Sequence, residues 1–64
     1  MRVRFRSKSG NEYIINIDYV NYMIYDYSVE KLEIGFQNKE TKVIDISRYE
    51  YETILYDKSR IGEN

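Results

Sequence analysis

The sequence contains no cysteine, histidine, proline, tryptophan or alanine among its 64 residues. Without cysteine no disulfide forms, and without cysteine and histidine the usual zinc and iron ligand sets cannot be built. Nucleophile–base pairs of the Ser–His or Cys–His type are excluded for the same reason. No glycine-rich phosphate-binding loop is present either. We therefore expect no metal, no cofactor and no catalytic residue, in a protein that is not an enzyme.

The eleven Asp and Glu residues leave a carboxylate dyad or a Mg²⁺ site formally open. None of these carboxylates lies in a recognisable motif, and several flank predicted turns or face solvent. The sequence therefore favours a binding role over a catalytic one.

A chain of 64 residues forms one domain. A domain of this size buries only about 60% of the surface that its unfolded chain exposes, and its core rarely supplies more than about 3–5 kcal/mol of net stability. With disulfides and the usual zinc and iron sites excluded, association is the remaining source of stability, and an apolar content of 42% points the same way. We expect a homo-oligomer, or a chain that docks on a partner.

The charge is balanced, with a net charge of −1 and a charged fraction of 33%. This is neither the excess of a strongly basic nucleic-acid binder nor that of an acidic mimic. No apolar run approaches the length of a membrane span, and the basic start has no apolar stretch after it, unlike a signal peptide. We expect a cytoplasmic protein with no membrane partner. Its richness in Ile, Tyr, Asn and Lys, which AT-rich codons encode, indicates a low-GC bacterium such as a Firmicute, or its phages or mobile elements.

Alternation of polar and apolar residues predicts a mainly β fold: a small antiparallel five-stranded sheet or barrel followed by one short C-terminal helix. The strands are predicted at residues 2–7, 12–17, 19–25, 30–36 and 41–46. We expect residues 19–25 to be covered on both faces, because both faces carry apolar side chains. Gly35, inside the fourth predicted strand, indicates a bulge or a close approach to the backbone.

Ser47 and Glu50 form a capping-box pattern, in which each side chain bonds to the other residue's backbone N–H. The pattern predicts a helix over residues 48–58, with Tyr51, Ile54, Leu55 and Lys58 on one face. Gly62 is expected to end the helix. We therefore expect a single domain over residues 1–60 and a frayed tail at 61–64.

Cationic side chains mark the first candidate surface. Period-two alternation places Val3 and Phe5 on one face of the first strand and three arginines on the other. Such a row suits contact with phosphate groups, but it is more typical of an edge strand guarded by charge against aggregation. The candidate ligand-binding residues are Arg2, Arg4, Arg6, Lys8 and Arg48.

Tyrosine marks the second candidate surface, because eight tyrosines in 64 residues is an unusual density. Tyr is enriched at protein interfaces, where it offers a large contact area at a low entropy cost. Tyr also favours strands, so part of this richness is expected from β-structure alone. The densest group, and our candidate subunit or partner interface, is Tyr19, Tyr22, Tyr25 and Tyr27.

The order of these signals resembles the carbon storage regulator (CsrA) family. The matching residues are Arg6, Gly10, Glu12, 32–36, 43–46, Arg48, Glu50 and the helix to Leu55. The resemblance implies an intertwined homodimer of five strands and a C-terminal helix per chain, which binds GGA-containing RNA. It also implies that Arg6 and Arg48 contact RNA. The family's Ala-Pro segment is replaced here by residues 37–41.

The small FlbD-like flagellar proteins are similar over the same span. The match lies in residues 16–18, which precede an apolar strand, and in Ser47 with Glu50 at the helix start.

Two functions follow from the sequence. The first is a non-catalytic binding or regulatory module, a homo-oligomeric accessory protein that modulates a host protein or sequesters a small ligand. The second is a CsrA-like RNA-binding regulator that uses Arg4, Arg6 and Arg48. The slightly negative net charge and the missing Ala-Pro segment favour the first.

Overall fold

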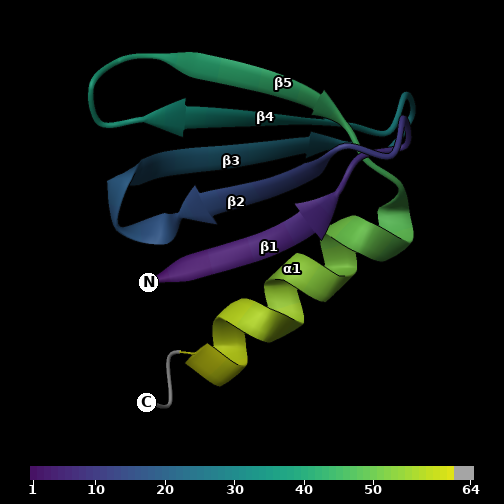
Figure 1. Cartoon of the computed structure of the whole chain (residues 1–64). Helices are drawn as coiled ribbons and strands as arrows, with labels where there is room; N and C mark the ends of the chain where they lie inside the picture. The colour runs from purple at the N-terminus through teal and green to yellow at the C-terminus, as the bar shows by residue number, and fades with distance from the viewer. Residues whose placement is uncertain (62–64) are drawn as a thin grey trace.

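The computed structural model describes residues 1–61, with side chains described as far as Tyr56. Five strands and two helices follow one another along the chain (Figure 1): β1 Arg2–Arg6, β2 Glu12–Asn16, the 3₁₀-helix η1 Ile17–Tyr19, β3 Val20–Asp26, β4 Lys31–Phe36, β5 Thr41–Asp45 and α1 Arg48–Ile61. The predicted order of five strands and a C-terminal helix is confirmed, as is the helix start at Arg48. The helix continues past its predicted end, and the predicted stop at Gly62 lies outside the described residues.

The strands form two antiparallel sheets: β1 pairs with β2, and β3, β4 and β5 form a three-stranded meander. The mainly β prediction is confirmed, but the single five-stranded sheet or closed barrel is wrong. The division occurs at η1, where the Asn16 side chain accepts a hydrogen bond of 3.0 Å from the Asp18 N–H. This bond starts a helical turn, so β2 and β3 enter different sheets instead of forming a hairpin.

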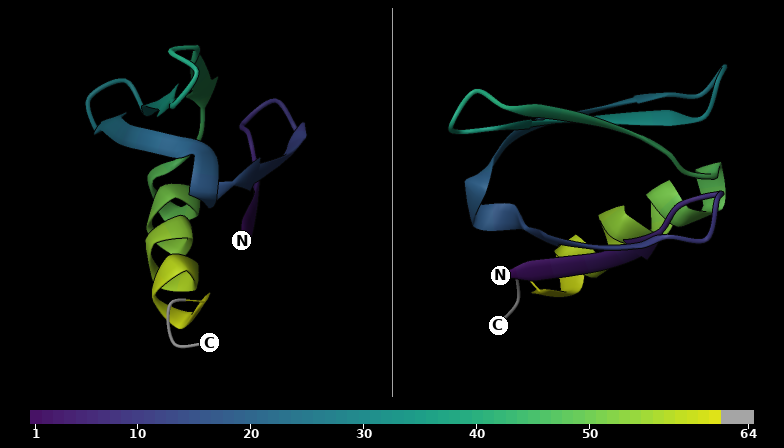
Figure 2. Two further views of the ribbon diagram at one scale, coloured as in Figure 1. Left: turned by 90° about the vertical axis from the view of Figure 1, so that its left-hand side faces the viewer. Right: turned by 45° about the horizontal axis from the view of Figure 1, so that its top comes forward.

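The core lies between the two sheets and α1, which packs along β1 and lies beneath the strands (Figures 1 and 2). Each of the three layers contributes side chains to it. The buried apolar residues are Val3, Phe5, Ile15, Leu32, Ile34, Ile44, Ile46 and Ile54. Alternation along each strand therefore sets which face becomes the core face.

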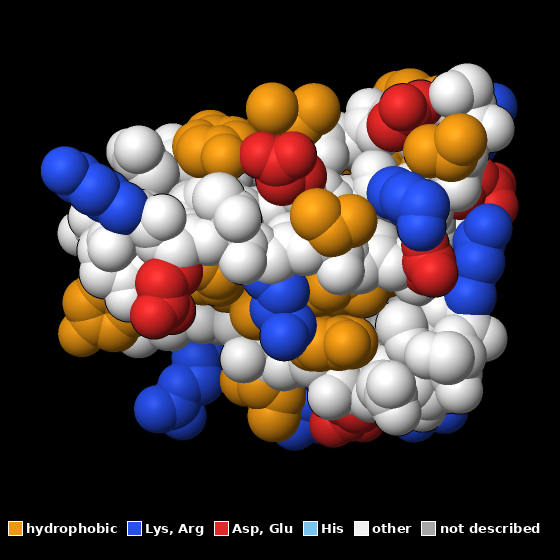
Figure 3. Space-filling model, turned by 90° about the horizontal axis from the view of Figure 1, so that it is seen from above, with side chains coloured by type: hydrophobic (Ala, Val, Ile, Leu, Met, Phe, Trp, Pro, Cys, Tyr) orange, Lys and Arg blue, Asp and Glu red, His pale blue; other side chains and the backbone are white. Residues whose placement is uncertain are grey.

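The prediction that both faces of β3 are covered is wrong. Met23 and Tyr25 pack against the core, whereas Ile24 is exposed on the outer face of the three-stranded sheet. No described element covers that face. Figure 3 views the molecule from the side on which β5 lies, and its hydrophobic side chains are scattered among charged ones. The apolar residues on this face therefore do not merge into one continuous patch.

The helix start is only half a capping box. The Ser47 hydroxyl accepts a hydrogen bond of 3.1 Å from the Glu50 N–H, as predicted. The reciprocal bond from Glu50 to Ser47 is absent from the described contacts, because the Glu50 carboxylate accepts from the Arg6 N–H at 2.9 Å. Glu50 therefore joins the helix to the edge of β1.

Candidate binding site

In the described part of the chain, one edge of β2 has no strand beside it. Two backbone bonds of 2.8 Å bracket the β1–β2 ladder, from Ser7 N–H to the Asn11 carbonyl and from Ile17 N–H to the Met1 carbonyl. Bonded and non-bonded pairs alternate along an antiparallel ladder. With the observed register, that alternation turns the backbone N–H and C=O groups of three residues away from β1. They are Glu12, Ile14 and Asn16.

The outer edge of β5 is free in the same sense. The bonds from Phe36 N–H to the Glu40 carbonyl, 2.9 Å, and from Ile46 N–H to the Glu30 carbonyl, 3.2 Å, fix the alternation of the β4–β5 ladder. It turns the backbone groups of Thr41, Val43 and Asp45 away from β4. Of these groups, the Asp45 carbonyl accepts a bond of 2.9 Å from the Lys8 N–H.

These two edges border an opening that is closed at both ends. The Lys8–Asp45 backbone bond closes one end. At the other end Gln37 bonds to η1, with its N–H 3.0 Å from the Tyr19 carbonyl and its side-chain amide 3.1 Å from the Asp18 carbonyl. Between the ends, the Lys42 ammonium reaches across to lie 5.5 Å from the centre of the Tyr13 ring.

The opening contains a hollow of about 570 Å³, which we call the slot. It is lined by residues 14–16 of β2, Tyr19 of η1, residues 36–38 and Glu40. Ile14 is 55% exposed and Tyr19 61% exposed. Apolar walls with a few polar groups at the rim, in a volume of this order, are typical of ligand sites.

Three cations lie near the slot, whose charged lining residue is Glu40. Arg2, Lys39 and Lys42 make no ion pair with another described residue. Arg2 faces Asn16 across the β1–β2 ladder, and Lys39 lies between two residues that line the slot. A second hollow of about 340 Å³, lined partly by Arg2 and Arg4, meets the slot at Ile14. Cations therefore border the slot although the whole chain has a net charge of −1.

The arginine row has the predicted geometry. Arg2, Arg4 and Arg6 are exposed on the outer face of β1, while Val3 and Phe5 are buried. The Glu12 carboxylate lies between two of the arginines, 3.4 Å from Arg4 Nε and 3.6 Å from an Arg6 terminal nitrogen. The row is therefore partly neutralised by its neighbouring strand.

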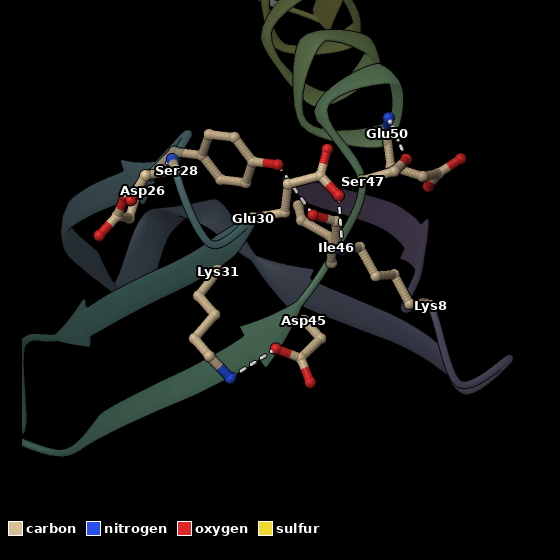
Figure 4. A network of polar contacts seen from close by, with 10 residues as sticks. Lys8, Asp26, Ser28, Glu30, Lys31, Asp45, Ile46, Ser47 and Glu50 are labelled. Carbon is tan, nitrogen blue, oxygen red and sulfur yellow. Dashed lines mark hydrogen bonds and ion pairs between the residues drawn. The ribbon is translucent and has the colours of Figure 1, made fainter.

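The other two candidate cations lie apart from the row and have carboxylate partners. Lys8 pairs with Glu30 (Figure 4), and this pairing lowers the pKa of the Glu30 carboxyl and raises the pKa of the Lys8 ammonium. Arg48 pairs with Glu52 at 3.2 Å and lies over the Tyr27 ring at 5.6 Å.

The four candidate tyrosines do not form one surface. Tyr25 stacks on Tyr51 with ring centres 4.3 Å apart, meets Tyr27 edge-on, and donates a hydrogen bond of 2.9 Å to the Ile46 carbonyl. This cluster joins β3 to α1. Tyr22 lies on the outer face of the three-stranded sheet, and Tyr19 lines the slot.

Sequence reasoning missed the slot. Its one local signal is Ile14, an apolar residue on the same face of β2 as Glu12 and Asn16. The remaining lining residues come together only through tertiary packing.

The described residues lack two further features. They contain no group of three Asp or Glu side chains placed to hold a metal ion. They also contain no helix with the length and apolar character to span a membrane.

No protein-family model, curated protein or solved structure matches this chain. The resemblances to the CsrA family and to the FlbD-like proteins therefore stay predictions.

Proposed function

We propose that this protein is a non-catalytic binding module, an accessory protein whose binding site is the slot between β2 and the β4–β5 hairpin. The observation that supports the proposal is the slot itself: an apolar hollow of about 570 Å³ with exposed side chains in its walls and two unpaired strand edges beside it. The absence of histidine and cysteine from the sequence favours binding over nucleophilic or general-base chemistry.

Photo-crosslinking in the native host tests this proposal. Tyr19→p-benzoylphenylalanine places the crosslinker in the slot, and Tyr49→p-benzoylphenylalanine is a matched control at an exposed helix position away from it. We expect a specific adduct from position 19 that is absent from position 49. The same adducts from both positions, or none from position 19, would contradict the proposal.

A second candidate function is RNA binding by the arginine row. The shared outward orientation of Arg2, Arg4 and Arg6 favours it, since such a row meets successive phosphates. Glu12 opposes it, because its carboxylate lies among the guanidinium groups.

Titration of a GGA-bearing RNA hairpin at low salt decides this second case. If the row binds RNA, Glu12→Gln tightens binding, and Arg6→Ala and Arg48→Ala each lower the salt slope by about 1. The absence of binding at low salt removes the candidate.

A further inference from the structure

We propose that the slot binds an extended, acidic peptide segment of a partner protein, which adds as a strand along the free edge of β2. This inference rests on the binding function proposed above and names its ligand.

Unpaired backbone groups on the facing edges of β2 and β5 favour an extended ligand. The N–H and C=O groups of Ile14 and the N–H of Asn16 point into the opening from β2, and the N–H and C=O groups of Val43 point toward it from β5. These groups have no backbone partner in either sheet. An extended peptide presents matching donors and acceptors at every second residue, which is how strand addition to a sheet edge works. A folded helix or a nucleic-acid strand offers no such row.

The apolar walls of the slot suit the alternating side chains of a strand. Ile15 and Phe36 lie beneath the opening, and the Ile14 and Tyr19 side chains stand beside it. Successive side chains of a strand alternate between its two faces. A peptide on the β2 edge therefore directs every second side chain toward these apolar walls and the others toward solvent.

Unpaired cations near the opening favour an acidic segment. Arg2, Lys39 and Lys42 border the opening without an ion pair to a described residue, and Glu40 is the carboxylate that lines it. Among the side chains near the opening that make no ion pair with another described residue, these three cations outnumber the single anion Glu40. Complementary charge of this kind steers a partner and rejects basic segments.

The closed ends limit the length of the segment. β2 has five residues, so its edge spans roughly 17 Å at the usual rise of a strand. The bonds at Asp45 and Gln37 close the opening beyond that span. About four or five peptide residues therefore pair inside it, and the flanking residues leave the slot toward solvent.

Panning a displayed library of random seven-residue peptides against the full chain tests the proposal. We expect enrichment of peptides that combine Asp or Glu with β-branched residues. Affinities of the synthesised peptides are then measured by fluorescence anisotropy. Tyr19→Ala weakens binding by about tenfold and Arg2→Ala severalfold, while the matched changes Tyr49→Ala and Arg48→Ala leave it unchanged. Circular dichroism confirms that each variant is folded.

Backbone N-methylation of one selected peptide tests strand pairing directly. Methylation at alternate residues abolishes binding, whereas methylation at the residues between them is tolerated, because only every second N–H faces β2. In the same complex the Ile14 N–H gains protection from hydrogen exchange.

Each contrary result has a distinct meaning. Peptides that bind in a Tyr19-dependent way but tolerate methylation at every position overturn strand addition and leave the slot as a binding site. An adduct from position 19 to RNA or to a second copy of this chain, with no peptide enriched, overturns the peptide ligand and likewise leaves the slot in place. A peptide affinity that Tyr19→Ala leaves unchanged overturns the inference. The crosslinking experiment tests separately whether the slot is a binding site.

Discussion

Tyr22 and Gly35 face each other on neighbouring strands, and the tyrosine ring lies directly over the glycine. A methyl group added at Gly35 would overlap the ring. The Tyr22 hydroxyl donates a hydrogen bond of 2.7 Å to Glu33, which holds the ring in this position. β3 also carries a bulge between Val20 and Tyr22. The interpretation of Gly35 as a sign of a bulge or a close approach is therefore confirmed.

The first prediction concerns this pair. Gly35→Ala destabilises the wild-type chain by about 1 kcal/mol, because the added methyl group displaces the ring and breaks its hydrogen bond. In a Tyr22→Ala background the same change is neutral or stabilising, since the space is free and alanine suits a strand better than glycine. Urea unfolding of the four proteins in this cycle measures the coupling. An equal loss in both backgrounds would mean that the ring is not the obstacle.

The second prediction concerns the Lys8–Glu30 pair, which joins the β1–β2 turn to the β3–β4 turn. The hydrogen bond from Lys8 lowers the pKa of Glu30 below its usual 4.5. The stabilising effect of the Glu30 carboxylate is therefore complete above the unfolded-state pKa, and it is lost as the pH falls through the folded-state value.

We expect Lys8→Met to flatten the acid limb of the stability curve. Without the ammonium group the Glu30 pKa lies closer to its unfolded-state value, so acidification removes less stability from the variant than from the wild type. Lys39→Met is the matched control, since Lys39 makes no ion pair with a described residue. Free energies of unfolding measured between about pH 3 and 6 compare the three proteins. An unchanged slope in Lys8→Met would contradict the prediction.

At the scale of elements, the polar side chains at the start of α1 make bonds of three kinds. The Ser47 hydroxyl caps the helix, and the Glu50 carboxylate accepts from the β1 backbone at Arg6. Glu52 pairs with Arg48 on the exposed helix surface. Glu50 therefore anchors the helix to β1, whereas Glu52 forms an ion pair on the exposed surface of the helix.

The third prediction separates these roles. Ser47→Ala lowers the free energy of unfolding by about 1 kcal/mol through the lost cap. Glu50→Ala costs about 1–2 kcal/mol, because it leaves the Arg6 N–H without its charged acceptor. The matched change Glu52→Ala costs less than about 0.5 kcal/mol. Hydrogen exchange provides the discriminating measurement: the Arg6 amide exchanges faster in Glu50→Ala than in Glu52→Ala. Equal exchange rates in the two variants would rule out the anchor.

Elements were predictable from the sequence where the signal is local. Alternation identified the inward residues of β1, and the Ser47–Glu50 spacing located the helix start. The pairing of strands into sheets was not predictable from the sequence, because pairing depends on contacts between distant segments and on the short helical turn that Asn16 begins. The second bond of Glu50 escaped prediction for the same reason, since its acceptor role depends on a strand 44 residues away.

At the scale of the whole molecule, two sheets and one helix enclose a single core with unequal sides. On one side α1 lies against β1, and its Tyr51 stacks on Tyr25 of β3. On the other side no described element lies between β2 and β5, and the slot occupies that place. The sequence predicted an excess of apolar residues over what so small a chain buries. It contained no signal for where that excess opens to solvent, because the slot exists only once both sheets are placed.

The fourth prediction follows from this architecture. Ile54 is 1% exposed and enters the shared core, whereas its neighbour Leu55 is 46% exposed. Ile54→Ala removes a buried side chain at a cost of about 2–5 kcal/mol, which is comparable to the roughly 3–5 kcal/mol that a core of this size supplies. We expect Ile54→Ala to be largely unfolded at 25 °C and Leu55→Ala to remain folded, as measured by circular dichroism and urea titration.

The dependence of unfolding on protein concentration shows whether the measured stability is that of the monomer or of an oligomer. If the chain is a homo-oligomer, association adds stability that grows with concentration. Ile54→Ala then regains structure when its concentration is raised about a hundredfold, and the wild-type urea midpoint rises with it. If the wild-type midpoint stays constant and Ile54→Ala regains no structure, the core alone supports the fold and the expected homo-oligomer is excluded over that range. Because the slot lies on the side away from α1, Tyr19→Ala in the same series shows whether self-association uses the slot: a midpoint that loses its concentration dependence in this variant places a second copy there.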